Sequence, residues 1–181
     1  GGSWVMTSII KVNNIQNSSG TAYNFIKQIE QTVLTTATLY TSSSAPIGTP
    51  VDTGISVTIA PLSSSSKILV MWNATVGHNV DTGHGYLFLR RGSSTNILVG
   101  TNTGSRTGAT HVINNLQPGE MHSVSGQYLD SPNTTSATTY ALYIATTSSD
   151  GTAINRSYRD NNATNYDGRG TSSITVMEVA G

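Results

Sequence analysis

Residues 123–147 constrain the fold of this chain more than any other stretch of the sequence. They predict two strands, residues 121–129 and 138–147, because apolar, aromatic and β-branched side chains alternate along both. A turn at residues 130–133 separates them, since Pro132 fixes its φ angle and Asp and Asn side chains hydrogen-bond to their own backbone. Neither strand has a wholly polar side. We expect a hairpin covered on both faces, in the middle of a sandwich or at a subunit interface.

Turn residues divide the rest of the chain into further short segments. Residues 67–77 are apolar on both faces, which is typical of a fully buried strand. Residues 51–59 alternate, and Gly54 predicts an irregularity within them. A helix stays possible for residues 25–31, but the threonine-rich remainder of residues 27–41 favours a strand. The other expected strands are residues 85–91, 96–99, 111–116, 152–159 and 172–179, with the first two of these paired as a hairpin.

Eight or more short strands at roughly 10-residue spacing indicate an all-β protein, either an antiparallel sandwich or a barrel. We predict a jelly-roll β-sandwich over residues 28–181, preceded by a short extended N-terminal segment, residues 1–27. No fixed-period repeat occurs, which argues against a solenoid or a propeller. The side chains expected in the core are Val70, Trp72, Tyr140, Leu142, Ile144, Ile174 and Val176.

Charged residues are scarce. They make up 10% of the 181 residues, whereas an ordinary globular domain has about 25%. Nine basic and nine acidic residues give a net charge of zero, so we expect no nucleic acid and no anionic membrane as partner. A surface with so little charge self-associates unless it is already covered, which favours an obligate homo-oligomer.

The chain has no cysteine, which excludes a disulfide framework and a thiolate metal site. No stretch approaches the roughly 20 apolar residues of a membrane span, and no signal peptide opens the sequence, so we expect neither membrane insertion nor ordinary secretion. This pattern fits a protein released by cell lysis inside a finished particle. Residues 1–5 precede Met6, and the sequence leaves open whether they are native.

The acidic residues offer little for catalysis. A glycoside hydrolase needs two carboxylates about 5 to 10 Å apart, and only Asp160 and Asp167 are close neighbours within one loop, where nothing apolar would raise a pKa. No G-x-S-x-G motif occurs. We therefore predict a protein that is not an enzyme and that carries no cofactor.

Two polar loops carry the remaining candidate residues. The first loop, residues 77–85, places the imidazoles of His78 and His84 near the carboxylate of Asp81, and these groups suit transition metals. The loop lacks a His-x-His pair, so we predict a polar turn and no metal site. The second loop, residues 160–170, and the two residues before it combine aromatic rings with guanidinium groups, which can contact a sugar or a protein epitope. The alternative is an ordinary solvated loop. Because loops gather at the ends of a sandwich, we expect Tyr158, Tyr166 and Arg169 to be exposed at one end. The candidate receptor-binding residues are Tyr158, Arg159, Asp160, Tyr166, Asp167, Arg169, His78, Asp81 and His84.

Residues 9–21 have the sequence IIKVNNIQNSSGT, which resembles a lead-in that is common in structural proteins of marine tailed phages. The segments YLDSP (128–132), TTY (138–140), INRS (154–157) and SITVMEVAG (173–181) resemble the jelly-roll domain of the same family. The resemblance covers nearly the whole chain. It implies a virion-surface or tail-fibre protein, normally a homotrimer with strand faces buried between subunits, and it supplies no catalytic residues.

We therefore predict a structural protein of the virion surface that displays loops for adhesion to a host receptor, either a surface glycan or a protein. Its N-terminal segment would attach it to other virion proteins. One alternative is a carbohydrate-binding module, which would place aromatic residues on an exposed face. Another is a capsid decoration protein without a receptor role.

Overall fold

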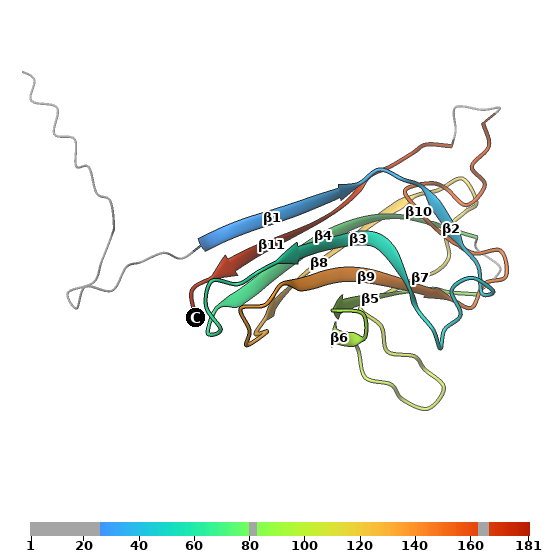
Figure 1. Cartoon of the computed structure of the whole chain (residues 1–181). Coiled ribbons are helices and arrows are strands. Elements are labelled where there is room, and N and C mark those ends of the chain that lie inside the picture. Colours follow the sequence, from blue (N-terminus) through green and yellow to red (C-terminus); the bar gives the residue numbers. More distant parts are fainter. Residues whose placement is uncertain (1–25, 80–82, 163–166) are drawn as a thin grey trace, which may run out of the picture.

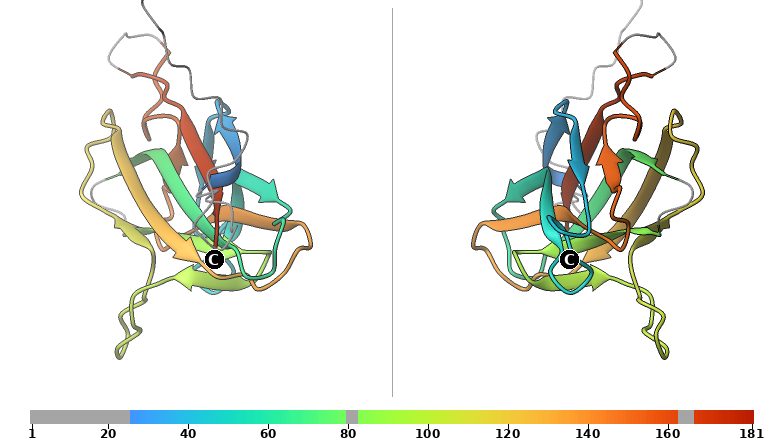
Figure 2. Two further views of the ribbon diagram at one scale, coloured as in Figure 1. Left: turned by 90° about the vertical axis from the view of Figure 1, so that its left-hand side faces the viewer. Right: turned by 90° about the vertical axis from the view of Figure 1, so that its right-hand side faces the viewer.

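The structure is a computed structural model that describes residues 26–79, 83–162 and 167–181. Within these ranges the chain forms β-strands and no helix. The strands make two antiparallel sheets that pack face to face, which Figure 2 shows as two layers. The predicted all-β sandwich is confirmed.

The first sheet is built around β4 (Lys67–His78), the longest of the described strands. One side of β4 pairs with β11 (Ser172–Val179) and, farther along, with β10 (Thr152–Ile154). Its other side pairs with β8 (His122–Asp130). Outside β11 lies β1 (Ile26–Leu34), and outside β10 lies β2 (Thr38–Tyr40), so the sheet is four strands wide (Figure 1).

The second sheet has the order β3-β9-β5-β6, with β7 also paired to β5. Its strands are β3 (Val51–Ile59), β9 (Thr138–Thr146), β5 (Gly85–Arg91), β6 (Thr95–Leu98) and β7 (His111–Ile113). The predicted β5–β6 hairpin is present. A register shift between Asp52 and Ser56 surrounds Gly54, whose φ of 82° suits glycine, so the predicted irregularity is confirmed.

The predicted hairpin of β8 and β9 is wrong, although both strands exist. β8 pairs with β4 in the first sheet, whereas β9 pairs with β3 and β5 in the second. The seven residues 131–137 therefore cross between the sheets instead of making a tight turn. Alternation reports which residues share a face, but it does not report the partner strand.

The inner faces of both sheets make one core, and all seven side chains predicted for it are buried. Trp72 lies opposite Gly126 of β8, where a Cβ atom would come within 2.3 Å of the indole ring. The outer side of β4 is only half-buried at Leu69 and Met71, so this strand is not covered on both faces as predicted. β8 likewise exposes Leu129 at 48%.

Residues 26–34 form strand β1, which decides against a helix in this region. β1 begins two residues before the predicted domain start at residue 28. Apart from residues 26 and 27, the predicted N-terminal segment lies outside the described residues.

Candidate functional site

The two predicted loops belong to the same end of the sandwich. β4 ends at His78, which pairs with Thr152 at the start of β10. After β10 the chain leaves the sheet at Arg156 and returns at Arg169, and these two residues form a β-bridge at the base of the excursion. We call residues 156–169 the charged loop. Figure 1 places it beyond β10, on the side away from the C-terminus.

Asp167 organises the charged loop. Its two carboxylate oxygens accept hydrogen bonds from Nε and Nη2 of Arg159, both at 2.9 Å. The Ser157 hydroxyl donates to it at 3.2 Å and the Asn161 amide at 2.7 Å. The Asp167 side chain is only 2% exposed. Mainly because of the Arg159 hydrogen bond, the pKa of this carboxyl is lowered to about 2.

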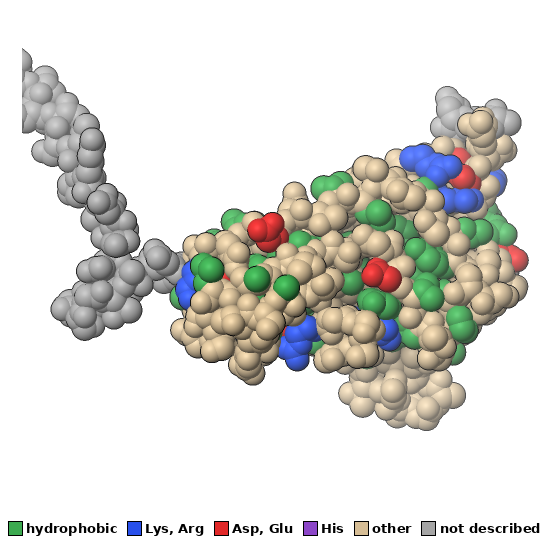
Figure 3. All heavy atoms as spheres, viewed as in Figure 1, with side chains coloured by type: hydrophobic (Ala, Val, Ile, Leu, Met, Phe, Trp, Pro, Cys, Tyr) green, Lys and Arg blue, Asp and Glu red, His purple; other side chains and the backbone are tan. Residues whose placement is uncertain are grey.

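Asp160 forms a second charged centre in the same loop. Its Oδ2 accepts a hydrogen bond from Nη2 of Arg169 at 2.7 Å and lies 3.3 Å from Nη1 of Arg156. Asp160 has a φ of 48°, which a short polar side chain tolerates. Three guanidinium groups and two carboxylates thus cross-link the loop, and Figure 3 shows blue and red side chains gathered at this end.

The structure brings together most of the residues predicted for this loop. Arg159 and Arg169 are exposed, with side-chain exposures of 46% and 59%. Tyr158 is half-buried, which is less exposed than we expected. Tyr166 lies outside the described residues. A hollow in the loop is lined by Asp160, Asn161, Asn162, Asp167 and Arg169.

We call residues 77–85 the histidine loop, and its two histidines differ in exposure. His78 is fully buried, and its ring nitrogens contact the Thr152 hydroxyl at 3.0 Å and the Gly83 carbonyl at 2.8 Å. Its burial removes it from any receptor-facing surface. His84 is exposed, with its ring 6.2 Å from that of Tyr86, while Asp81 lies outside the described residues.

No group of three or more His, Asp or Glu side chains in the described ranges is placed to hold a metal ion. Those ranges also contain no helix of the length and hydropathy needed to cross a membrane.

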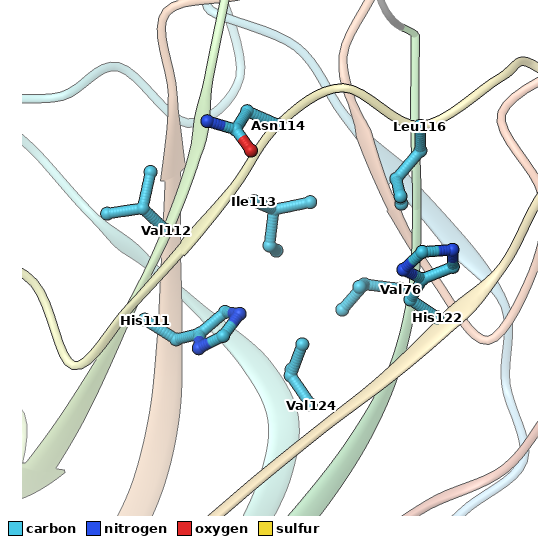
Figure 4. Close-up of a pocket in the computed structure, with 8 residues that line it drawn as sticks. All are labelled: Val76, His111, Val112, Ile113, Asn114, Leu116, His122 and Val124. Atoms are coloured by element: carbon cyan, nitrogen blue, oxygen red, sulfur yellow. The ribbon is translucent and has the colours of Figure 1, made fainter.

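Sequence reasoning did not connect His111 with His122, although both line one hollow (Figure 4). His111 belongs to β7 in the second sheet and His122 opens β8 in the first, so no spacing in the sequence relates them. Five of the eight residues that line the hollow are apolar, and desolvation by burial lowers the pKa of the His111 imidazole. The apolar lining residues are Val76, Val112, Ile113, Leu116 and Val124.

No protein-family model and no curated protein matches this chain. The arguments for its function therefore rest on its own residues.

Proposed function

We propose that this chain is a non-enzymatic structural protein of a phage virion surface, a tail-fibre or surface-fibre domain whose loops adhere to a host receptor. The observation that carries the proposal is the charged loop. Its ion pairs cross-link the described residues of an exposed excursion of the chain, residues 156–162 and 167–169, and add nothing to the apolar core. A binding surface held rigid before contact loses less entropy when it binds.

The state of the loop carboxylates supports a non-enzymatic role. A general acid needs a pKa near the working pH, whereas the pKa of Asp167 is lowered to about 2 and leaves it ionised. Asp160 contacts two guanidinium groups. Both carboxylates are paired with guanidinium groups, whereas the acid of a glycoside hydrolase lies in apolar surroundings.

The strand order supports the jelly-roll part of the proposal. Each sheet is four strands wide, which matches the eight strands of a jelly roll. Successive strands alternate between the sheets from β2 to β5 and from β7 to β10, whereas β1 and β2, β5 to β7, and β10 and β11 follow one another within one sheet.

We further propose that the chain assembles as a homotrimer through the outer face of the first sheet, and that residues 1–25 join it to other virion proteins. Three rows of outward side chains cross all four strands of this face without a charged residue. From the strand spacings, the three rows extend about 17 Å along β4, from Leu69 to Asn73, and about 19 Å across the four strands. This uncharged area of about 320 Å² would form the centre of the interface, and a standard interface of ~800 Å² per partner extends beyond it. The rows are Ile29, Met177, Leu69 and Leu129; then Gln31, Thr175, Met71 and Gln127; then Val33, Ser173, Asn73 and Ser125.

Adsorption to bacteria tests the receptor role. Fluorescently labelled protein would be mixed with a panel of marine bacteria, using the parent and the double variant Arg159→Ala/Arg169→Ala. We expect at least a tenfold loss of adsorption for the double variant. Arg106→Ala is the matched control, because Arg106 is an exposed arginine in the β6–β7 connection.

A polysaccharide depolymerisation assay on the same cells tests the non-enzymatic part. Cleavage of any surface polysaccharide by the parent would overturn it. If the parent and the double variant are both folded and adsorb equally, the charged loop does not bind the receptor.

A further inference from the structure

The second sheet carries an aromatic surface on its outer face, away from the charged loop. Along β9, Tyr140, Leu142 and Ile144 point into the core, so Tyr143 points outward. Along β5, Leu87 and Leu89 are in the core. The residues between and beside them therefore point outward, and they are Tyr86, Phe88 and Arg90.

The pairing of β5 with β9 brings these side chains together. Phe88 lies directly opposite Tyr143, and Tyr86 lies opposite Ala145. Phe88 is only 4% exposed although it is outside the core cluster, so its neighbours on the outer face cover it. Tyr86 and Tyr143 are half-buried and leave part of each ring accessible. Small residues, Ala141 and Ala145, flank Tyr143 along its strand, so its ring stands above them.

Polar groups border the Tyr143 ring on both sides. The Arg90 guanidinium lies over it, with Cζ 4.4 Å from the ring centroid. Nε and Nη1 of Arg90 donate to the Asn96 side chain at 2.9 Å and the Ser93 carbonyl at 3.0 Å, so the stacked group is held in place. On the neighbouring strand β3, Asp52 lies directly opposite Tyr143.

Each of these polar groups keeps hydrogen-bonding capacity. Nη2 of Arg90 makes no hydrogen bond within residues 26–79, 83–162 and 167–181. Oδ2 of Asp52 likewise makes no hydrogen bond within these residues, whereas Oδ1 of Asp52 accepts a hydrogen bond from the Gly54 backbone amide at 2.8 Å. A donor and an acceptor thus flank one partly open aromatic ring.

We propose that this outer face binds a neutral saccharide. The faces of aromatic rings carry partial negative charge and attract the weakly positive C–H groups of a sugar ring. Charged donors and acceptors make the strongest hydrogen bonds to hydroxyl groups. One guanidinium and one carboxylate cancel in charge, so an uncharged sugar is favoured over an acidic one. The exposed His84 ring beside Tyr86 extends the surface for a further sugar unit.

A printed array of neutral and acidic oligosaccharides tests this site. We expect the parent to bind neutral members, with a loss of at least tenfold in apparent affinity for Tyr143→Ala and for Arg90→Lys. Lysine keeps the charge of Arg90 but cannot stack as a plane. Tyr143→Phe keeps the ring and should retain most of the binding, and Arg106→Ala should bind as the parent does.

Each variant would first be compared with the parent in urea unfolding, and Tyr86→Ala replaces Tyr143→Ala if the latter does not fold. No binding by the parent would overturn the proposal, and so would binding of acidic sugars alone or equal binding by folded Tyr143→Ala. Dissociation of an oligomer by Tyr143→Ala would also overturn it, because a second copy would then occupy this face. If the array is negative while adsorption to bacteria still depends on Arg159 and Arg169, this inference fails and the proposed receptor role of the charged loop stands.

Discussion

The outer faces of the two sheets expose different kinds of side chain. Across the first sheet, aliphatic, thioether, amide and hydroxyl groups form three rows without a charge or an aromatic ring. Across the second, Tyr86 and Tyr143 lie beside Arg90 and Asp52. Both faces belong to sheets four strands wide in one sandwich. The backbone therefore provides two similar platforms, and the outward residues alone make them chemically different.

This difference suggests two kinds of partner. Uncharged aliphatic rows fit another flat protein surface, because burying them releases water without leaving charges unpaired. Aromatic rings with a rigid donor and acceptor fit a small ligand that has both C–H and hydroxyl groups. The predictions that follow test whether the faces are separate in this way.

The largest expected effect is on assembly. The double variant Met71→Lys/Leu129→Lys places two charges on the first face, and we expect it to convert the oligomer into a 19.0 kDa monomer. Native mass spectrometry measures the change. Leu62→Lys is the matched control, because Leu62 is 69% exposed and lies outside the strands. A parent that is already monomeric would refute the assignment of this face to a second copy.

A second prediction concerns the residue that ties the two sheets together. Asp130 at the end of β8 contacts Arg91 of β5 at 2.9 Å and accepts a hydrogen bond from the Tyr140 hydroxyl of β9 at 2.7 Å. Asp130→Ala leaves both partners without their acceptor. Because Arg91 is partly exposed, we expect a loss of about 2–3 kcal/mol in the free energy of unfolding, below the range for fully buried pairs. Tyr140→Phe should lose about 1 kcal/mol.

Urea unfolding of these two variants gives the free energies. Both should keep saccharide binding within a factor of two, since neither side chain reaches the outer face of the second sheet. Equal stability of Asp130→Ala and the parent would contradict the role of this contact.

A third prediction compares two glycines. Gly126→Ala puts a Cβ atom within 2.3 Å of the Trp72 ring, and overpacking of this kind typically costs about 1–3 kcal/mol. Gly48→Ala meets nothing within 4 Å, so we expect it to be neutral or to stabilise by up to about 1 kcal/mol. The midpoint of urea unfolding should therefore fall for Gly126→Ala and stay the same or rise for Gly48→Ala. A Gly126→Ala variant as stable as the parent would mean that Trp72 has room to move.

The smallest expected effect is a pH dependence of the charged loop. The pKa of Asp167 is lowered from 3.8 to about 2, chiefly by its hydrogen bond from Arg159. A lowered pKa means that the folded state favours the ionised carboxylate. Its stabilising contribution is therefore complete above pH 4 and is lost as the pH falls towards 2. NMR titration of the loop amides should show this transition in the parent and lack it in Asp167→Asn. Loss of loop order already at pH 5 would assign the effect to another group.

Local sequence patterns predicted most strands of this fold. Alternation in residues 172–179 and the buried character of residues 67–77 lead directly to β11 and β4, because side chains in a strand alternate between two faces. Ser, Asn and Gly between the strands indicated where they end. Scarce charge predicted a surface prone to self-association, and the outer face of the first sheet carries three rows of side chains without a charge.

The pairing of strands could not be predicted in the same way. Residues 131–137 read equally well as a hairpin turn and as a crossover between sheets, and only the packing of both sheets places β8 beside β4 and β9 beside β5. The same holds for the candidate sites. His78 belongs to a polar loop in the sequence but is buried once Thr152 and Gly83 surround it.

The sequence by itself determined which residues alternate, where strands end and how little charge the surface carries, since these properties depend on neighbours along the chain. Tertiary structure decided which alternating face meets the other sheet and which meets solvent. A hairpin covered on both faces would bury Tyr143, but this side chain is half-buried on the outer face because Leu142 and Ile144 fill the core. The contact of Arg90 with Tyr143 exists only once β5 pairs with β9, and the contact of Asp130 with Tyr140 exists only once the two sheets pack together.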